Sequence, residues 1–336
     1  MSRWFIGIIT LGFLMAGCTS SPSSVVPTPP QPIQNAQVRR FPDGMLVPPE
    51  AANPTLAAVI IDNMKEARPP AGITGAPLVI EAPVEGGITR LLAFYQLDSA
   101  SNKIGPVRSL RPYFLHLAED FAGLVVHVGG SPEALTQEKT SSVIGLNEFF
   151  NTLSFWRDQA RSAPHNVYTS ISRLSEAYLT KQHSKNPPTL TNNPWHYLET
   201  LQGTALLKDA PRVTIPTNNP DYMVLWRWDA LTHHYTRLQG EHIHKDANGV
   251  VVSASNVMIM QATIAVLDEV GRRSIDLTGQ GKVWLVRDGK LIQGLWQRGE
   301  GKPLSFFSLQ GEALPLHPGT TWIEIIPDSV TPDFSS

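Results

Sequence analysis

The 336-residue sequence contains a single cysteine, Cys18, so no disulfide can form within the chain. Its formal net charge is only -2 and no block of basic residues occurs along it, which argues against a nucleic-acid partner. The apolar run from Trp4 to Ala16 is too short for a comfortable membrane-spanning helix. These shortages exclude a disulfide-stapled scaffold and a nucleic-acid-binding protein, and they make the apolar run a candidate signal segment.

Motifs of the common enzyme classes are also missing. The sequence has no Walker phosphate-binding loop, no dinucleotide glycine fingerprint, no cysteine-based metal site and no zincin helix. Their absence counts against those classes but leaves other catalytic arrangements open. The hydrophobic fraction of 42% and the charged fraction of 17% are ordinary for a folded protein, and the length suffices for two domains.

The one cysteine stands at the end of the apolar run. Arg3 supplies the positive end of a signal segment, and Met15-Ala16-Gly17-Cys18 closes the segment with small residues before the thiol. This sequence resembles the lipobox of bacterial lipoproteins, whose cysteine carries fatty acyl chains such as palmitate. We therefore predict a signal peptide over residues 1–18 and an extracytoplasmic protein anchored to a membrane through lipid on Cys18. Which membrane stays open, and the alternative is an uncleaved anchor with an incidental cysteine.

Composition divides the remaining chain into four parts. Residues 19–50 are rich in Ser, Pro and Gln, which predicts a disordered tether. Residues 51–185 alternate between strand and helix patterns, and residues 212–328 contain mostly short strands. Residues 186–211 begin with a proline-rich break and are the predicted linker. The expected fold class is α+β, with an N-terminal α/β layered domain followed by a mainly β C-terminal domain.

Short apolar runs and helical spacing locate the expected elements. Asp288-Gly289, between two apolar runs, is the strongest hairpin signal. In the first domain we expect strands at 56–61, 78–80, 91–95 and 124–128, and helices at 112–121 and 171–183. In the second domain we expect strands at 223–226, 250–252, 257–260, 282–286 and 322–326.

The densest group of polar residues lies in the N-terminal domain, next to predicted strand ends. Arginine guanidinium groups suit phosphate or carboxylate, and paired glycines let backbone N–H groups approach an anion. The sequence therefore predicts a site for an anionic ligand. The candidate residues are Asp62, Asn63, Glu81, Glu85, Gly86, Gly87, Arg90, Arg108, Arg111, Gly129, Gly130 and Ser131.

Two other interpretations of this cluster stay open. It fits an internal network of arginine–carboxylate pairs, because a charge removed from water needs a partner. It also fits an enzyme in which Asp62, Glu81 and Glu85 hold a divalent cation, Mg²⁺ or Ca²⁺, for phosphoryl transfer or hydrolysis on envelope polymers or lipids. No other cofactor is indicated.

Histidines supply further candidates. His127 and His165 are candidate catalytic bases, although His127 also fits a histidine of the core. Ser131 lacks the flanking glycines of a nucleophile elbow and fits a turn hydroxyl better. His242 and His244 would share one face of a strand, so they are a candidate pair of metal ligands.

Longer runs of residues in both domains form recognisable motifs. They are Ile61-Asp62-Asn63, Ala67-Arg68-Pro69, Glu85-Gly86-Gly87-Ile88-Thr89-Arg90, Gly105-Pro106-Val107-Arg108-Ser109, His127-Val128-Gly129-Gly130-Ser131, Tyr235-Thr236-Arg237, Asn256-Val257, Gly279-Gln280-Gly281 and Pro318-Gly319-Thr320-Thr321-Trp322. These runs resemble the YerB-like family of bacterial lipoproteins. The resemblance covers residues 55 to 328 and implies a lipid-anchored envelope protein whose two halves have no established activity. With the charged cluster, it favours a protein that binds an anionic cell-wall polymer, a lipid or another envelope protein through its arginines.

Overall fold

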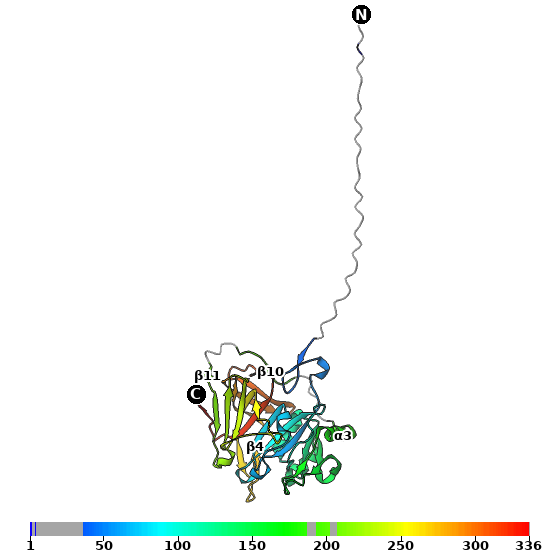
Figure 1. Ribbon diagram of the computed structural model, residues 1–336, viewed down its shortest axis with the longest axis vertical. Helices are drawn as coiled ribbons and strands as arrows, with labels where there is room; N and C mark the ends of the chain where they lie inside the picture. The colour runs from blue at the N-terminus through cyan, green and yellow to red at the C-terminus, as the bar shows by residue number, and fades with distance from the viewer. Residues whose placement is uncertain (2–3, 5–35, 187–192, 202–206, 336) are drawn as a thin grey trace. The chain divides into compact units, whose positions relative to one another are not determined.

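A computed structural model describes residues 36–186, 193–201 and 207–335, together with Met1 and Trp4. The rest of the signal segment, Cys18 and residues 19–35 of the expected tether lie outside the described residues. Residues Gln37–Ser336 form one compact unit (Figure 1). Within the part of the chain that the structure describes, no helix is long and apolar enough to cross a membrane.

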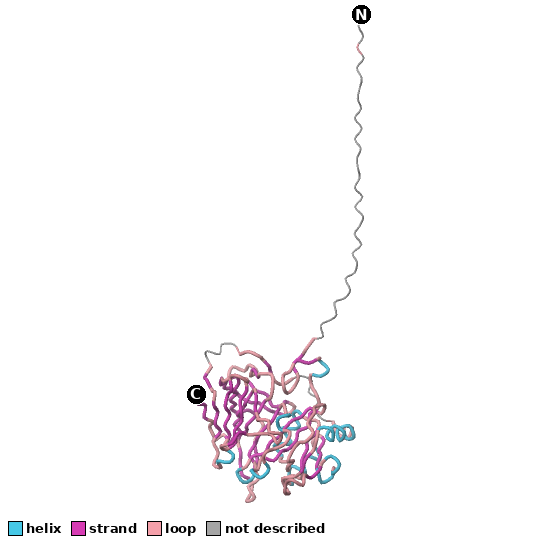
Figure 2. The backbone as a smooth tube through the Cα atoms, viewed as in Figure 1, coloured by secondary structure: helices cyan, strands magenta, loops and turns pink. Residues whose placement is uncertain are grey.

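The compact unit is built around an 11-stranded sheet that contains both parallel and antiparallel neighbours (Figure 2). Its strands, in sheet order, are β11 (Lys208–Asp209), β21 (Lys290–Gly299), β20 (Gly279–Arg287), β17 (Asn256–Ala262), β24 (Thr321–Pro327), β4 (Leu78–Pro83), β5 (Thr89–Gln96), β3 (Leu56–Asp62), β6 (Leu124–His127) and β7 (Ile144–Asn147), with β22 (Lys302–Ser308) beside β21.

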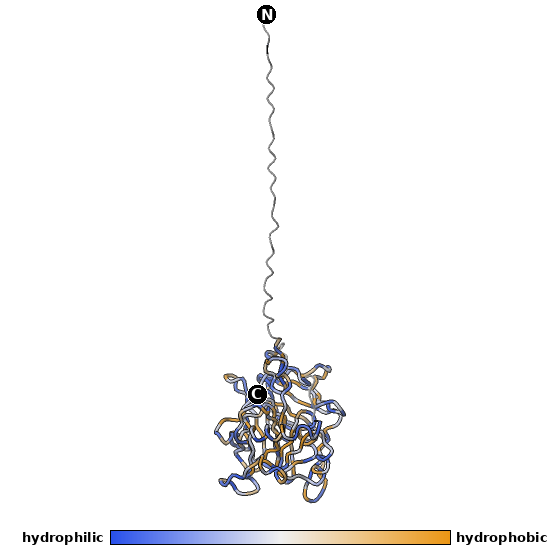
Figure 3. Tube along the Cα trace, turned by 90° about the vertical axis from the view of Figure 1, so that its right-hand side faces the viewer, coloured by the Kyte–Doolittle hydropathy of each residue, from blue (hydrophilic) through white to orange (hydrophobic). Residues whose placement is uncertain are grey.

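Both faces are buried at the centre of this sheet, which explains why β3, β4, β17 and β24 are largely continuous apolar runs in the sequence. Alternate residues from Leu56 to Ile61 in β3 join two different core clusters, and each is at most 1% exposed. One cluster packs on helix α1 (Pro112–Phe121), and the other packs on α3 (Ile171–Lys181) and on a second sheet. Hydrophilic segments lie mostly in the peripheral loops (Figure 3).

The second sheet and the smaller elements complete the unit. The second sheet has the order β15 (His242–Ile243), β14 (His234–Gln239), β13 (Val224–Asp229), β12 (Arg212–Ile215) and β25 (Asp333–Ser335), with β16 (Ser253–Ala254) beside β14. The remaining elements are α2 (Pro132–Thr140) and four strand pairs, β1 (Val38–Arg39) with β2 (Leu46–Val47), β8 (Trp156–Arg157) with β9 (Val167–Tyr168), β10 (His196–Tyr197) with β23 (Pro315–Leu316), and β18 (Ile264–Val266) with β19 (Arg273–Ile275).

The expected α+β class is confirmed, and most expected elements are present. Helix α1 has the bounds predicted for residues 112–121, with proline in its first turn. Asp288 and Gly289 have φ angles of 52° and 71°, as a two-residue turn between β20 and β21 requires. The strand expected at 250–252 is wrong, because this run closes a turn in which Val250 is 53% exposed and Val251 makes a single bridge to Lys245.

The two halves of the chain contribute strands to the same sheet. Strand β24 lies between β17 and β4 and is parallel to both. In the β4–β24 register, Thr321 is opposite Leu78 and Glu324 is opposite Glu81. Residues expected in separate domains are therefore direct neighbours at the centre of the sheet.

The folded part of the chain begins earlier than the composition suggests. We expected a tether to residue 50, but the hairpin of β1 and β2 already packs on the body. Phe41 is fully buried, and its ring centroid lies 5.0 Å from those of Phe121 and Trp195. Trp195 comes from the expected linker and donates its indole N–H to the Leu304 carbonyl at 3.0 Å. A single buried aromatic residue hardly changes the average composition of a proline-rich stretch, so composition did not predict this packing.

Replacing Phe41 tests whether residues 37–50 belong to the folded body. We expect Phe41→Ala to lower the free energy of unfolding by about 3–5 kcal/mol, the usual effect of removing a buried phenyl ring. Urea denaturation followed by tryptophan fluorescence measures this change. Phe150→Ala is the control, because Phe150 is 84% exposed and its loss should change stability by about 0.5 kcal/mol or less. An unchanged midpoint for Phe41→Ala would contradict the packing.

Candidate functional site

Strand ends bring part of the predicted cluster together. Asp62 ends β3 and is opposite Arg90 in the antiparallel register with β5. The segment that carries Arg108 is bonded to the same strand, because the Arg108 backbone N–H donates to the Ile60 carbonyl at 2.9 Å. Asp62 thus ends β3, as its position directly after a predicted strand suggested, and Arg90 and Arg108 lie beside this strand end.

Asp62 is the centre of a three-residue cluster. It is 1% exposed, and its Oδ2 lies 3.0 Å from Nε of Arg108 and 2.7 Å from Nδ1 of His165. Its Oδ1 accepts the Met64 backbone N–H at 3.0 Å. The buried carboxylate thus has a donor or a positive charge beside both of its oxygens, and it fixes the orientation of Arg108 and His165.

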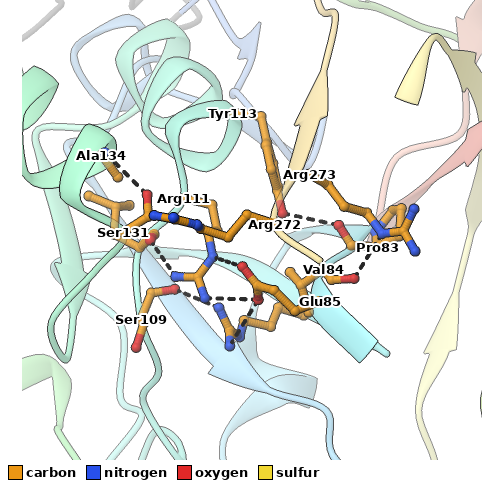
Figure 4. Close-up of polar contacts among 12 residues, drawn as sticks. Pro83, Val84, Glu85, Ser109, Arg111, Tyr113, Ser131, Ala134, Arg272 and Arg273 are labelled. Atoms are coloured by element: carbon orange, nitrogen blue, oxygen red, sulfur yellow. Dashed lines mark hydrogen bonds and ion pairs between the residues drawn. The ribbon is translucent and has the colours of Figure 1, made fainter. Parts of the chain in front are cut away.

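Arg111 and Glu85 form a two-pronged ion pair (Figure 4). Nε and Nη2 of Arg111 donate to the two carboxylate oxygens of Glu85 at 2.6 and 2.8 Å, the geometry in which a guanidinium binds a carboxylate best. Burial raises the pKa of Glu85, but the hydrogen bonds and charge of Arg111 outweigh it, so that the net pKa lies below the usual value. The two N–H groups of Arg111 that could bind an anion side by side are therefore already bonded to Glu85.

Arg90 is the most buried of the three arginines, at 5% exposed. Its Nη2 lies 3.8 Å from Glu85, and its Nη1 donates to the Ser109 carbonyl at 3.1 Å. Burial and the nearby charge of Arg111 lower its pKa to about 10, so it stays charged at neutral pH. Each predicted arginine thus faces a carboxylate, and Arg108 is the most exposed of the three side chains, at 18%.

The glycines Gly86 and Gly87 both have a φ of 69°, which explains the need for glycine in the turn between β4 and β5. A Cβ atom at either position would meet nothing within 4 Å. Glycine is therefore required at both positions for the backbone conformation, and not because a neighbouring atom lies close.

Polar groups of the turn Gly129-Gly130-Ser131 form hydrogen bonds within the protein. The Gly129 N–H donates to Oδ1 of Asn147 at 3.0 Å, and a Cβ on Gly130 would lie 3.0 Å from the Leu135 side chain. Ser131 is the N-cap of α2, where its hydroxyl accepts a backbone N–H at 3.3 Å. This agrees with a turn hydroxyl at Ser131.

His127 and His165 have different hydrogen-bond partners and belong to different clusters. His127 is fully buried, and its Nδ1 and Nε2 lie 2.7 Å from the Gly129 carbonyl and 3.0 Å from Glu138. Both ring nitrogens of His127 are thus engaged, as in a histidine of the core. His165 belongs to the Asp62 cluster instead.

Glu81 belongs to a second polar network that the sequence did not reveal. It accepts hydrogen bonds from Asn63 at 3.2 Å and from Thr89 at 2.5 Å, and Arg237 lies 2.5 Å from its other oxygen. Glu324, opposite Glu81 on β24, lies 3.6 Å from Arg237. Burial, followed by the charge of Glu81, raises the pKa of Glu324 to about 8. The pair of carboxyl groups therefore holds one proton at neutral pH.

One signal could have revealed Arg237. Strand β14 alternates between buried and half-exposed residues, and Tyr235, Arg237 and Gln239 share its buried face. Arg237 stands two residues after the apolar Tyr235, so both lie on the same face of the strand. A charged residue on a buried face predicts a buried ion pair. Glu324, inside an otherwise apolar strand, carries the matching signal.

The candidate metal ligands are not brought together. Among the residues that the structure describes, no three His, Cys, Asp or Glu side chains are placed to hold a metal ion. Asp62, Glu81 and Glu85 each face a different arginine. His242 and His244 do not share a strand face, because β15 ends at residue 243, leaving His242 exposed and His244 buried.

Comparison with known proteins identifies the family. Residues 44–185 and 213–323 match the N-terminal and C-terminal domain models described as "Protein of unknown function (DUF3048)". A relative from Bacillus subtilis (strain 168), "Putative lipoprotein YerB", is 35% identical over 273 residues, 81% of each chain. The chain belongs to the YerB-like, DUF3048 family.

A solved structure of this YerB-like family shows the same fold. The crystal structure of the YerB protein from Bacillus subtilis has a TM-score of 0.75 and 32% identity, covering 87% of this chain and 98% of that one. The family membership expected from the sequence motifs is confirmed. The family descriptions name a lipoprotein and domains of unknown function, and they name neither a ligand nor a reaction.

The Glu85–Arg111 ion pair predicts a pH dependence of stability. The folded-state pKa of Glu85 is lowered, so the pair stabilises the fold above the unfolded pKa of about 4.5 and loses this effect as pH falls through the folded value. We expect Glu85→Gln to be destabilised near pH 7 and to approach wild-type stability near pH 3. Urea denaturation across this range measures it. Glu300→Gln, at an exposed position, is the control, and a difference that does not vary with pH would contradict the assignment.

Proposed function

We propose that this YerB-like protein is a lipid-anchored protein of the bacterial cell envelope that binds an anionic ligand without transforming it. The lipobox that ends at Cys18 and the description of the Bacillus subtilis relative as a lipoprotein support the anchor. Several acyl chains on one cysteine hold a protein firmly at a bilayer, since each buried methylene contributes about 0.8 kcal/mol. The ligand would be a phosphate-bearing wall polymer or lipid, or an acidic partner protein.

The observation that carries the binding proposal is the way Asp62 holds Arg108 and His165. Asp62 contacts Nε of Arg108 and Nδ1 of His165, so the terminal nitrogens of Arg108 and Nε2 of His165 stay off the carboxylate. These two side chains are 18% and 14% exposed, whereas that of Asp62 is fully buried. Nη1 of Arg108 has a long hydrogen bond to the Pro164 carbonyl, at 3.5 Å, and no carboxylate contact. A guanidinium held with its terminal nitrogens at the surface suits a phosphate or carboxylate.

Excess charge in the surroundings also favours an anion. Three arginines face two carboxylates, those of Asp62 and Glu85, which leaves one positive charge in excess. Arg273 adds another nearby, with its Nε donating to the Val84 carbonyl at 3.0 Å (Figure 4). Because these charges are partly removed from water, their attraction for an anion is less screened than that of a surface lysine.

The geometry supports binding better than catalysis. The enzymatic alternative, a phosphotransferase or hydrolase of phosphorylated envelope polymers or lipids, needs Asp62, Glu81 and Glu85 around one cation. In the structure these carboxylates face Arg108, Arg237 and Arg111 respectively. An arginine beside each carboxylate takes the place that a cation would need.

Removing the lipid attachment point tests the localisation. We expect Cys18→Ser to abolish incorporation of labelled palmitate and to move the protein from the membrane fraction to the soluble fraction. Fractionation of cells that express each form, with immunoblotting, measures the shift. A Thr19→Ser variant is the control, because it leaves the thiol in place. Membrane association that persists in Cys18→Ser without acylation would contradict the proposed anchor.

Replacing Arg108 tests the binding site. We expect Arg108→Ala to weaken binding of inorganic pyrophosphate at least tenfold, equivalent to about 1.4 kcal/mol, with a smaller fall in its thermal midpoint than Arg111→Ala causes, because Asp62 keeps its contacts with His165 and the Met64 N–H. Isothermal titration calorimetry and thermal denaturation measure the two quantities.

Two variants keep this test specific. Arg227→Ala removes an exposed arginine from β13 and controls for net charge. Arg111→Ala breaks the ion pair with Glu85 and should lower the midpoint. A steep fall in the midpoint of Arg108→Ala, or unchanged binding, would instead assign Arg108 to the internal network.

A further inference from the structure

A second candidate site lies beside the loop that follows Asp62. Its cavity of about 500 Å³ is bounded by this loop, by the turn before β13 and by the hairpin of β14 and β15. Cavities of this size hold small organic ligands. None of its lining residues belongs to the Asp62, Arg108 and His165 cluster.

Gln239 lines this cavity and carries a buried N–H donor without a partner in the part of the chain that the structure describes. It is 4% exposed and lines the cavity, and its Oε1 accepts a hydrogen bond from Nη1 of Arg237 at 3.0 Å. An arginine can only donate, so the amide oxygen must face Arg237 and the amide nitrogen must point elsewhere. Nε2 of Gln239 has no hydrogen-bond partner among the described residues.

His244 presents a second unpaired donor. It is 5% exposed and lines the same cavity, and its Nδ1 lies 2.8 Å from Nη1 of Arg237. Nδ1 must therefore be the unprotonated nitrogen, and burial together with the charge of Arg237 lowers the pKa of the ring well below 6.5. The ring is neutral with its proton on Nε2, and this N–H also lacks a partner in the described chain.

Two buried donors without acceptors are unfavourable, because each has lost its water and gained no partner within the described chain. Both are held in place by the same guanidinium, which donates to Gln239 and His244 from one nitrogen. Arg237 therefore positions two N–H groups that an acceptor oxygen in the cavity would satisfy together.

The walls of the cavity indicate the rest of the ligand. The charged residues of the lining are Lys65, Arg68 and Lys245 against Asp221 and Glu241, which leaves one positive charge in excess, and Lys65 pairs with Asp221 at 3.0 Å. The three nitrogens of Arg68 donate to the carbonyls of Asn63 and Asp221 and not to a carboxylate. Pro69, Pro220 and Ile243 supply apolar surface. A positive charge and two donors beside apolar walls suit an anion with an aliphatic portion.

We infer that this cavity binds a small amphipathic anion whose carboxylate or phosphate oxygen accepts hydrogen bonds from Nε2 of Gln239 and Nε2 of His244. Arg68 faces the charge of the anionic group, and the aliphatic portion packs against the prolines. The shared chemistry is an anionic oxygen on an organic chain, and the site is independent of the one proposed around Arg108.

Titration of the purified full chain with hexanoate, hexyl phosphate and hexanol tests the inference. We expect the two anions to bind saturably and hexanol to bind at least tenfold more weakly, and the stronger anion identifies the preferred group. In spectra of the ¹⁵N-histidine-labelled protein, the Nε2 signal of His244 should shift on binding. Equal binding of hexanol and the anions, or no saturable binding up to about 10 mM, roughly 3 kcal/mol, would overturn the inference.

Two variants remove the donors separately. Gln239→Met and His244→Phe keep the shape of the side chain without the N–H group, and each should weaken anion binding at least tenfold. His234→Phe is the matched control, because His234 lies on the same strand outside the cavity lining. If a variant fails to fold, the change in the Nε2 signal of His244 when the anion binds to the wild-type protein still tests the site. Anion binding that persists unchanged in both folded variants would refute the site.

Discussion

The pairing of β4 with β24 determines much of the polar interior. Its parallel register sets Glu81 opposite Glu324, and both carboxyl groups are at most 3% exposed. Two neighbouring carboxylates cannot both stay ionised out of water. A proton on the pair and the charge of Arg237 resolve the conflict, with the pKa of Glu324 raised to about 8 by burial and by Glu81. The sheet shared by the two halves of the chain thus places two buried carboxyl groups and one arginine at its centre.

Arg237 connects the sheet junction to the cavity. Its Nη2 lies on Glu81, and its Nη1 donates to both Gln239 and His244. The side chain that stabilises the junction thus also fixes the amide orientation of Gln239 and the tautomer of His244. Asn63 extends the network to the loop after β3 through its bond to Glu81. Residues of this loop line the cavity, and Asp62 at its start contacts Arg108.

Of the eleven strands of the central sheet, the sequence predicted seven as apolar runs, namely β3, β4, β5, β6, β17, β20 and β24. It assigned no range to β7, β11, β21 or β22, which are short or alternate between buried and exposed residues. It also predicted that Asp62 and Arg90 would lie near strand ends. It did not predict that β24 would insert beside β4, because pairing between distant segments leaves no local pattern. Nor did it show that Arg111 would be bound by Glu85, because a sequence gives the charges but not the distances between them.

Most buried charges in this protein meet partners from the chain itself. Arg111 meets Glu85, Arg108 meets Asp62, and Arg237 meets Glu81. The charged clusters that stand out in the sequence are therefore largely satisfied, so their residue types alone are weak indicators of a ligand. Unpaired neutral donors are more informative in such a protein, because the fold that supplies partners to its arginines supplies none, within the described residues, to the donors of Gln239 and His244.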